Sequence, residues 1–399
     1  MLIKATLSNT RHPEYGEVTI PLPIKTSEYD RTMEMLANLE IGDVMGRDCK
    51  IMELSSPYSI LQKLEGSEVN IDELDYLAKR LESFEADQDL QFQAAAFARG
   101  VASIEDFINL TFCSDQATVI YDFTKLEEAG RQHFMNLHGG CASTEELENL
   151  DGYETALLLI DGGGAEITPY GVLYDNGMQM EQLYKGGPFP PYLYDAYELV
   201  LPVSPTQSPQ NKTYLYLPSS NLQLERTLLR GGIMEREGWF HKLEPIQLSS
   251  VITAKLDTRR DSIRELNEMC RSIHLLSHVD RSKLDAAVEY AQAKTASQIR
   301  KVAEHLDQFD FAPGVHTPEE YGRYMIRDSG HFNYDSNLDE FYDYGKYGRQ
   351  HLEQSQGMFT EQGYISYQGV LSLEALMKEA PTEQFQEEQG EDLEMGGPT

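Results

Sequence analysis

The sequence predicts an α+β protein made of two tandem repeat units, each a small β/α subdomain followed by a mainly helical subdomain, in an elongated arrangement. Two observations lead to this prediction. Residues 73–171 align without a gap on residues 265–363, at a shift of 192 positions. A strand-like segment precedes each copy, at residues 18–24 and 213–218, and a helix-like segment follows each of these strands. We therefore expect both halves to share one order of elements.

The chain is long enough for several domains, and its composition marks their borders. Residues 204–211 combine Pro, Ser and polar side chains, as is typical of an exposed linker. From residue 379 the chain is acidic, rich in Gly and Gln and poor in apolar residues, so we expect a disordered tail. The predicted segments are an N-terminal β/α subdomain at 1–70, a first helical unit at 71–203, a second β/α subdomain at 212–262, a second unit at 263–378 and the tail at 379–399.

Helices are predicted from apolar spacing and from capping residues. Residues 71–81 place Leu74, Leu77 and Leu81 on one face of a helix, and residues 263–273 are their counterpart. Capping boxes mark three further helix starts, because a hydroxyl stands three positions before a glutamate in each. These pairs are Thr124 with Glu127, Ser143 with Glu146, and Thr317 with Glu320, the last with Pro318 at the first helical position.

Each unit is predicted to end in a short hairpin with glycine at the turn, at residues 165–174 and 357–367. The three glycines at 162–164 stand between a helix-like and a strand-like segment, where they favour a helix stop. A phosphate-binding loop is the alternative. The Rossmann spacing and the P-loop lysine are both absent, which makes this alternative the weaker one.

The charge of the chain is its most informative compositional feature. The sequence has 33 Lys and Arg against 66 Asp and Glu, a net charge of −33. Such an excess repels itself, so we interpret it as serving a partner or solubility rather than folding. Duplex DNA carries one charge per about 1.7 Å, so −33 matches roughly 56 Å of duplex. A basic, DNA-binding protein is therefore the predicted partner, and an ordinary solvated acidic surface is the alternative.

Other partners and sites are disfavoured. No cluster of Lys and Arg with interleaved aromatic residues occurs, which argues against direct binding of nucleic acid. No apolar stretch predicts a membrane partner, and the first residues do not resemble a secretory signal, so the chain is expected to be cytoplasmic. The four cysteines are scattered as in reduced proteins. His133, His138 and Cys141 have ligand-type spacing but no fourth ligand, and we predict no metal or cofactor.

The candidate partner-binding residues are carboxylates that helical spacing places on common faces. Acids at i, i+3 and i+4 stand about 5–6 Å apart, close to the spacing of phosphates. The predicted acidic face comprises Glu82, Glu85, Asp87, Asp89, Glu127, Glu128, Glu145, Glu146, Glu148, Asp151, Glu319, Glu320, Asp335, Asp339, Glu340 and Asp343. No catalytic residue is predicted. Arg131 and Arg323 are expected to form ion pairs inside each unit, and the tyrosine-rich runs at 189–197 and 342–347 fit either packing or an interface.

The run Phe341-Tyr-Asp-Tyr-Gly-Lys-Tyr-Gly-Arg349, followed by residues 357–365, resembles the C-terminal signature of ArdA-type antirestriction proteins. Residues 108–112, continuing to Gly130 and Arg131, are similar to a neighbouring part of that family. The resemblance implies an elongated acidic DNA mimic of a mobile genetic element, which self-associates and occupies the DNA-binding groove of type I restriction–modification enzymes. Residues 1–70 do not resemble the family's usual N-terminal domain, and Thr155-Ala156-Leu157 stands where the second copy has Tyr347-Gly348-Arg349.

We interpret the chain as a non-enzymatic antirestriction DNA mimic. An acidic interaction or scaffold protein of a conjugative element, bound to another basic partner, is the alternative. Charges scattered uniformly over the surface favour that alternative, whereas one continuous acidic stripe favours mimicry. A hydrolase is a third interpretation, and it requires a concave pocket with converging polar groups.

Overall fold

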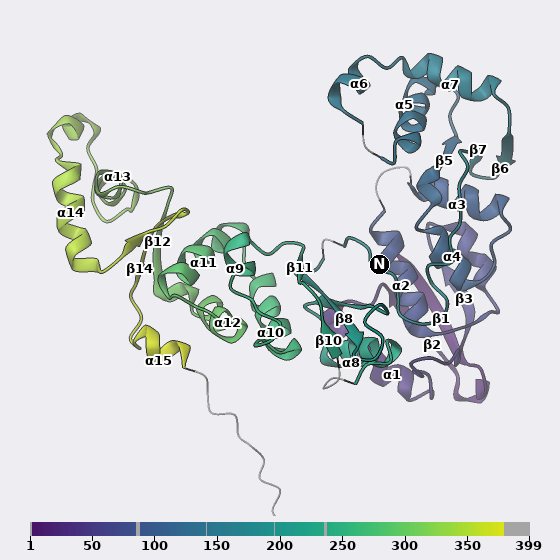
Figure 1. Ribbon diagram of the computed structural model, residues 1–399, viewed down its shortest axis with the longest axis horizontal. Helices are drawn as coiled ribbons and strands as arrows, with labels where there is room; N and C mark the ends of the chain where they lie inside the picture. The colour runs from purple at the N-terminus through teal and green to yellow at the C-terminus, as the bar shows by residue number, and fades with distance from the viewer. Residues whose placement is uncertain (1, 85–87, 141, 195, 235–237, 379–399) are drawn as a thin grey trace, which may run out of the picture. The chain divides into compact units, whose positions relative to one another are not determined.

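The computed structural model describes residues 2–84, 88–140, 142–194, 196–234 and 238–378 (Figure 1). The chain divides into two compact units, Met1–Leu248 and Ser249–Thr399. Helices alternate with small antiparallel sheets in both units, so the predicted α+β class is confirmed. The predicted tail, together with Glu85, Asp87 and Cys141, lies outside the described residues. Within the described part, no helix is long and apolar enough to cross a bilayer.

The N-terminal sheet of the first unit has the strand order β2-β1-β3-β4. Every second residue at the start of β1 is buried, as expected for a strand with one face on the core. Helices α1 and α2 belong to the same subdomain as this sheet. Helix α2 buries Leu74, Leu77 and Leu81, which confirms the helix predicted there. The bounds are β1 (Ile3–Asn9), β2 (Glu17–Leu22), α1 (Tyr29–Ala37), β3 (Cys49–Ser55), β4 (Glu68–Val69) and α2 (Ile71–Glu82).

A second subdomain of this unit follows two more helices, α3 (Gln88–Ala98) and α4 (Ile104–Leu110). Its sheet has the order β5-β7-β6, and three helices are inserted between the first and second of these strands in the chain. Gly163 and Gly164, with φ of 73° and 77°, end the last helix, which confirms the predicted helix stop. The bounds are β5 (Ala117–Ile120), α5 (Leu126–Leu137), α6 (Thr144–Glu148), α7 (Gly152–Asp161), β6 (Ala165–Thr168) and β7 (Gly171–Asp175).

The first unit closes with a sheet in which β8 pairs with β9, β10 and β11. The connection from β8 to β9 contains most of the predicted linker at 204–211. Because these strands are antiparallel partners, with Val203 opposite Thr213, this stretch is a hairpin connection within one sheet rather than a linker between separate bodies. The bounds are β8 (Leu199–Pro205), β9 (Thr213–Leu217), α8 (Asn221–Arg230), β10 (Gly238–Phe240) and β11 (Glu244–Pro245).

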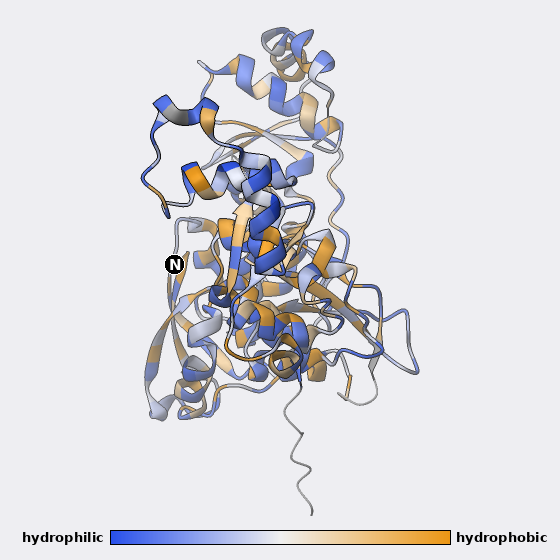
Figure 2. Ribbon diagram, turned by 90° about the vertical axis from the view of Figure 1, so that its left-hand side faces the viewer, coloured by the Kyte–Doolittle hydropathy of each residue, from blue (hydrophilic) through white to orange (hydrophobic). Residues whose placement is uncertain are grey.

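The second unit begins with a helical layer and ends in a small sheet of order β12-β14-β13. Apolar residues line the inner faces of its helices, while their outer faces are hydrophilic (Figure 2). The bounds are α9 (Ser250–Thr253), α10 (Ile263–His274), α11 (His278–Tyr290), α12 (Ala296–Glu304), β12 (Phe309–Pro313), α13 (Pro318–Arg323), α14 (Tyr344–Ser355), β13 (Met358–Phe359), β14 (Gly363–Tyr367) and α15 (Leu373–Met377).

Residues 117–175 and 309–367 have the same arrangement of strands and helices. Their sheets share one strand order, and both central pairings begin at equivalent positions, Ala117 opposite Asp175 and Phe309 opposite Tyr367. Helices α2 and α10, which precede the two segments, also have bounds that differ by 192 positions. Each segment ends in the predicted hairpin, β6–β7 in the first and β13–β14 in the second.

Two of the three predicted capping boxes are confirmed. Ser143 and Glu146 cap α6, and Thr317 and Glu320 cap α13 with Pro318 in the first turn. The third is wrong, because Lys125 is the residue before α5. The hydroxyl of Thr124 instead donates to Asp122, 2.7 Å away, and this local bond competes with capping.

Helices α5 and α7 cross at a glycine contact, and so do helices α13 and α14. A Cβ on Gly130 of α5 would lie 1.8 Å from the carbonyl oxygen of Gly152 in α7. In the second unit, a Cβ on Gly322 of α13 would lie 2.0 Å from the carbonyl oxygen of Tyr344, and one on Gly348 of α14 would lie 1.7 Å from that of Pro318. Both pairs therefore pack backbone against backbone, and no side chain separates them.

Candidate partner-binding surfaces

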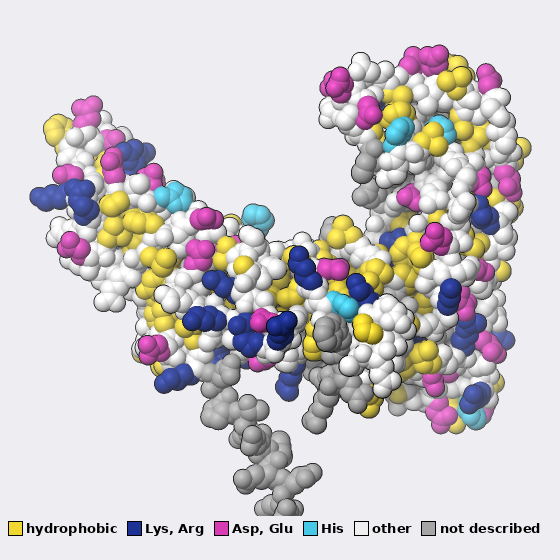
Figure 3. All heavy atoms as spheres, viewed as in Figure 1, with side chains coloured by type: hydrophobic (Ala, Val, Ile, Leu, Met, Phe, Trp, Pro, Cys, Tyr) yellow, Lys and Arg dark blue, Asp and Glu magenta, His cyan; other side chains and the backbone are white. Residues whose placement is uncertain are grey.

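Acidic charge is concentrated in particular subdomains. Residues 117–175 have 11 acidic and 2 basic side chains, a net charge of −9, and residues 309–367 have 10 and 4, a net charge of −6. The helical layer at 263–304 has 6 acidic and 7 basic side chains. Acidic side chains accordingly gather over α5, α6 and α7, whereas Lys and Arg gather over α10 to α12 (Figure 3). The charge is thus distributed unevenly among the subdomains, unlike the uniform scatter that would favour the scaffold alternative.

Some predicted acids of the first subdomain bond to neighbouring groups, and others, called unengaged here, have no bond to their side chains among the described residues. Glu127 forms an ion pair with Arg131 at 2.9 Å, as predicted, and accepts a hydrogen bond from the backbone of Tyr153. Glu128 lies 3.3 Å from Lys125. Asp151 and Glu146 cap helices. Among the described residues, no bond is found for the side chains of the two remaining exposed acids, Glu145 and Glu148.

The predicted acids of the second subdomain divide in the same way. Glu319 lies 3.4 Å from Arg323, which is the predicted ion pair. Three of the acids accept hydrogen bonds from backbone amides at the starts of helices; these are Glu320, Asp335 and Asp343. Glu340 is exposed, and no bond to its side chain is found within the described part of the chain.

Asp339 is the centre of a tyrosine cluster. It accepts hydrogen bonds from the hydroxyls of Tyr334, at 2.7 Å, and of Tyr344. The guanidinium groups of Arg327 and Arg323 lie 5.1 and 5.2 Å from the ring centres of these two tyrosines. The hydrogen bond from Tyr344, then that from Tyr334, lowers the pKa of Asp339. Within the run at 342–347, Tyr344 thus donates to this carboxylate and the ring of Tyr342 lies 5.8 Å from that of Tyr344, so these two tyrosines have the packing role that was the first of the two predicted.

This cluster should respond to acid. Because folding lowers the pKa of Asp339, its contribution to stability is present above its ordinary pKa near 4 and is lost as the pH falls through the lowered value. We expect an acid-induced change in tyrosine near-ultraviolet circular dichroism below about pH 4. Asp339→Asn should remove that step, and Glu340→Gln, at the neighbouring exposed position, should keep it. An unchanged titration in Asp339→Asn would contradict this role.

The acids predicted at 82–89 are only partly described. Glu82, at the end of α2, accepts a hydrogen bond from the hydroxyl of Tyr194, and Asp89 is exposed in the first turn of α3. The structure places both in the first unit, on different helices from the acids at 127–151. The acids at 82–89 thus belong to a candidate face separate from those at 145–151 and 335–343.

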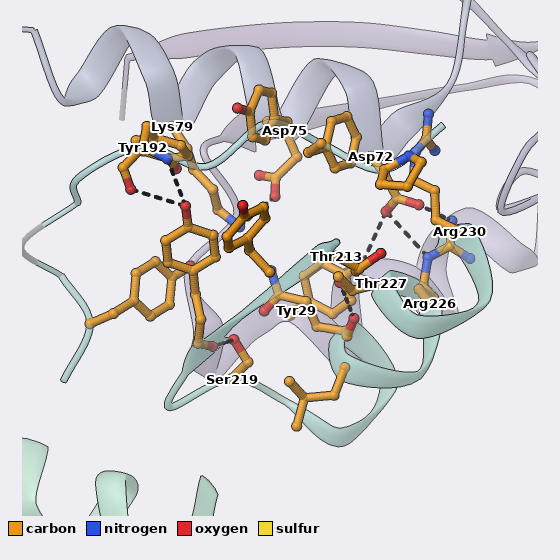
Figure 4. A pocket seen from close by; sticks show the side chains of 18 residues that line it. Tyr29, Asp72, Asp75, Lys79, Tyr192, Thr213, Ser219, Arg226, Thr227 and Arg230 are labelled. Atoms are coloured by element: carbon orange, nitrogen blue, oxygen red, sulfur yellow. Dashed lines mark hydrogen bonds and ion pairs between the residues drawn. The ribbon is translucent and has the colours of Figure 1, made fainter. Parts of the chain in front are cut away.

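A partly open cavity of about 80 Å³ lies where α8 meets α2 (Figure 4). Arg226 of α8 binds Asp72 of α2 at 2.8 Å, and Lys79 binds Asp75 at 2.8 Å. Although burial opposes it, the Asp75 carboxylate raises the pKa of Lys79. Aromatic rings complete the lining, including Tyr29, Tyr76, Phe189, Tyr192, Tyr197 and Tyr216. The aromatic run at 189–197 thus packs inside the first unit.

The charges at this cavity neutralise one another. Arg230, also on α8, binds the buried Glu73 at 3.4 Å and the backbone carbonyl of Val44 at 2.8 Å. Buried, mutually paired charges hold helices together but offer no free acid or base. The arrangement therefore positions α8 and does not favour the hydrolase interpretation. Sequence reasoning missed it because Glu73 and Arg230 are 157 positions apart.

The predicted metal candidates have other roles. His133 contacts the hydroxyl of Thr118 at 3.0 Å, and burial lowers its pKa. The ring of His138 lies 2.7 Å from the carbonyl oxygen of Phe134. Cys141 lies outside the described residues, and no group of three metal-ligating side chains is found in the described part. Cys49, Cys113 and Cys270 are buried and are not in disulfides, and burial raises the pKa of Cys113 to about 11.

Residues 213–366 match the family model of the antirestriction protein ArdA. This part of the chain is ArdA-like. The match begins at the first residue of β9 and ends within β14, so the ArdA-like segment includes α8, the helical layer, both glycine-crossed helices α13 and α14, and the tyrosine cluster. The acidic subdomain at 117–175 lies outside the matched residues, although its strand order and register are the same. A search of the curated proteins finds no relative.

Proposed function

We propose that this protein is a non-enzymatic DNA mimic that blocks the DNA-binding groove of type I restriction–modification enzymes in the cytoplasm. The observation that carries the proposal is the match of an antirestriction family to residues 213–366, in a chain of net charge −33. Its target is a protein surface that normally binds phosphates, so exposed carboxylates on a fixed scaffold are the chemistry required.

The proposed mimic has two acidic subdomains in tandem. The equal strand order and pairing of residues 117–175 and 309–367 support this duplication. Glycine-crossed helices keep each subdomain narrow, and capping carboxylates fix the starts of its helices. The carboxylates without structural bonds, Glu145, Glu148 and Glu340, are the ones that we assign to partner contacts.

Competition with DNA tests the proposal. The purified full chain should displace labelled duplex from a type I restriction enzyme, and displacement should weaken as salt rises, because exposed charges are screened. Failure to displace duplex at any salt concentration would reject this target.

Removal of unengaged carboxylates should weaken the displacement. We expect Glu145→Gln combined with Glu148→Gln to raise the concentration needed by about 3- to 30-fold at low salt, as for the loss of one or two rim charges. Glu53→Gln combined with Glu225→Gln changes the net charge equally at exposed positions outside the proposed surfaces and should have little effect. Equal effects of the two double variants would show that only net charge matters and would reject the assignment of these residues.

A further inference from the structure

Helix α7 has more apolar surface than its packing uses. Residues 156–160 are Ala-Leu-Leu-Leu-Ile, and five consecutive residues of a helix point to all sides of it. Helix α5 covers only one side, at the glycine crossing, where Gly152 and Ala156 are buried. Leu157 is 39% exposed and Leu158 is 67% exposed. The apolar run therefore faces solvent over much of its circumference.

Neighbouring elements extend this surface. Tyr153, one turn before Leu157 on α7, is 53% exposed, and Leu137 at the end of α5 is 57% exposed. Ile167, on the edge strand β6 that follows α7 after three glycines, is 84% exposed. Hydrophobic and histidine side chains lie together over α5 and α7, with acidic side chains at their edge (Figure 3). We call these five residues the α7 surface: Leu137, Tyr153, Leu157, Leu158 and Ile167.

The second subdomain does not have this surface. At the shift of 192 positions, the counterparts of Leu137, Tyr153, Leu157 and Leu158 are Ser329, Gly345, Arg349 and Gln350, and only Ile167 has an apolar counterpart, the half-buried Phe359. The two subdomains share their backbone arrangement, so the fold itself does not require apolar residues there. The α7 surface therefore has a role that the second subdomain lacks.

Charge indicates what covers the α7 surface. Exposed carboxylates surround or interrupt it, including Glu145, Glu148, Glu154, Asp161 and Glu166. The subdomain's two basic residues, Lys125 and Arg131, are already paired with Glu128 and Glu127. A symmetric dimer through this face would bring a net charge of −9 against −9, which is unfavourable. A basic protein surface with apolar side chains at its centre is complementary instead.

We propose that the α7 surface is an apolar contact with the basic DNA-binding enzyme that the acidic faces bind; this inference rests on the proposed function. An apolar contact of this kind would make the affinity for the partner less sensitive to salt. Charged contacts are screened within about 8 Å at physiological ionic strength, and DNA loses affinity in the same way. Apolar contact is not screened. A mimic with an apolar anchor therefore keeps affinity at salt concentrations where the DNA that it displaces is weakened.

The test compares apolar and charged variants of the full chain in the duplex-displacement assay, at about 50 and 200 mM salt. Leu158→Gln combined with Ile167→Thr removes two anchors and retains residues suited to a helix and a strand. We expect it to need at least about 10-fold more protein at both salts, as for loss of an interface hot spot. Glu145→Gln combined with Glu148→Gln should matter mainly at low salt. Val370→Thr, at a fully exposed apolar position in the second unit, is the matched control.

The outcomes separate the two proposals. If wild-type protein displaces duplex and the apolar double variant does so equally at both salts, the α7 surface is not a contact and the mimicry proposal stands. If wild-type protein displaces no duplex, both proposals fall. Sedimentation supplies a further readout: a wild-type dimer that the apolar variant dissociates would identify a second copy as the occupant and overturn the basic partner. Unchanged far-ultraviolet circular dichroism verifies that the variant is folded.

Discussion

Gly348→Ala should disrupt the crossing of α13 and α14, whereas Gly345→Ala, one turn earlier on the same helix, should be tolerated. A Cβ at Gly348 would lie 1.7 Å from the carbonyl oxygen of Pro318, which is backbone and has no rotamer to change. A Cβ at Gly345 would first meet the end of the Arg349 side chain at 3.4 Å. We expect Gly348→Ala to cost at least about 3 kcal/mol, the upper range for overpacked sites.

Hydrogen exchange followed by mass spectrometry is the appropriate measurement, because it separates the second unit from the first. Peptides from residues 318–355 should lose protection in Gly348→Ala. They should keep or gain it in Gly345→Ala, since alanine is favoured over glycine within a helix by roughly 0.5–1 kcal/mol. Equal protection in both variants would mean that the helices can separate without loss of stability. The same comparison in the displacement assay shows whether binding needs this subdomain.

Arg230→Met should destabilise the first unit severely. Arg230 is 4% exposed, and its guanidinium bonds to Glu73, to Tyr184 and to the carbonyl oxygens of Gly187 and Val44. Its removal leaves the buried Glu73 with hydrogen bonds from Tyr184 and the backbone of Asn70, and with Arg47, at 3.8 Å, as the remaining cation within the described part of the chain. A buried carboxylate that loses its partner typically costs about 3–5 kcal/mol.

Urea denaturation of two further variants tests whether the unpaired charge of Glu73 causes the loss of stability in Arg230→Met. Lys125→Met breaks an exposed ion pair with Glu128 and should leave the free energy of unfolding almost unchanged, because exposed ion pairs contribute little. Glu73→Gln added to Arg230→Met should recover part of the loss, because it removes the unpaired charge. A double variant no more stable than Arg230→Met alone would assign the loss to the other hydrogen bonds of the arginine.

Local chemistry explains which elements could be predicted from the sequence. Ser143 and Thr317 cap their helices with a glutamate three positions later, and the amphipathic spacing at 71–81 gives helix α2. Thr124 satisfied the same pattern, but Asp122 two positions earlier takes its hydroxyl. Spacing rules count positions along the chain and do not include such competition.

The features that the sequence did not predict depend on distant residues. In the sequence, nothing distinguishes Glu73 from the other acids of this chain. In the structure it is 2% exposed, and it is paired there with Arg230 of another helix. Gly130 is identical in both copies, but its reason is contact with Gly152, a position that is tyrosine in the second copy. The backbone carbonyl makes that contact in both copies. Position 152 itself requires glycine only in the first copy, where a Cβ would lie 2.3 Å from the carbonyl oxygen of Glu127, so the two copies do not share a residue that marks the contact.

The glycine crossings have an evolutionary consequence. Helices α5 and α7 pack against each other through their backbones. Substitutions on their outward faces should therefore have little effect on folding of the subdomain. Such positions are free to drift under selection for binding alone. Under the proposed function, outward side chains of one subdomain can therefore change to suit a different target while the other subdomain stays as it is.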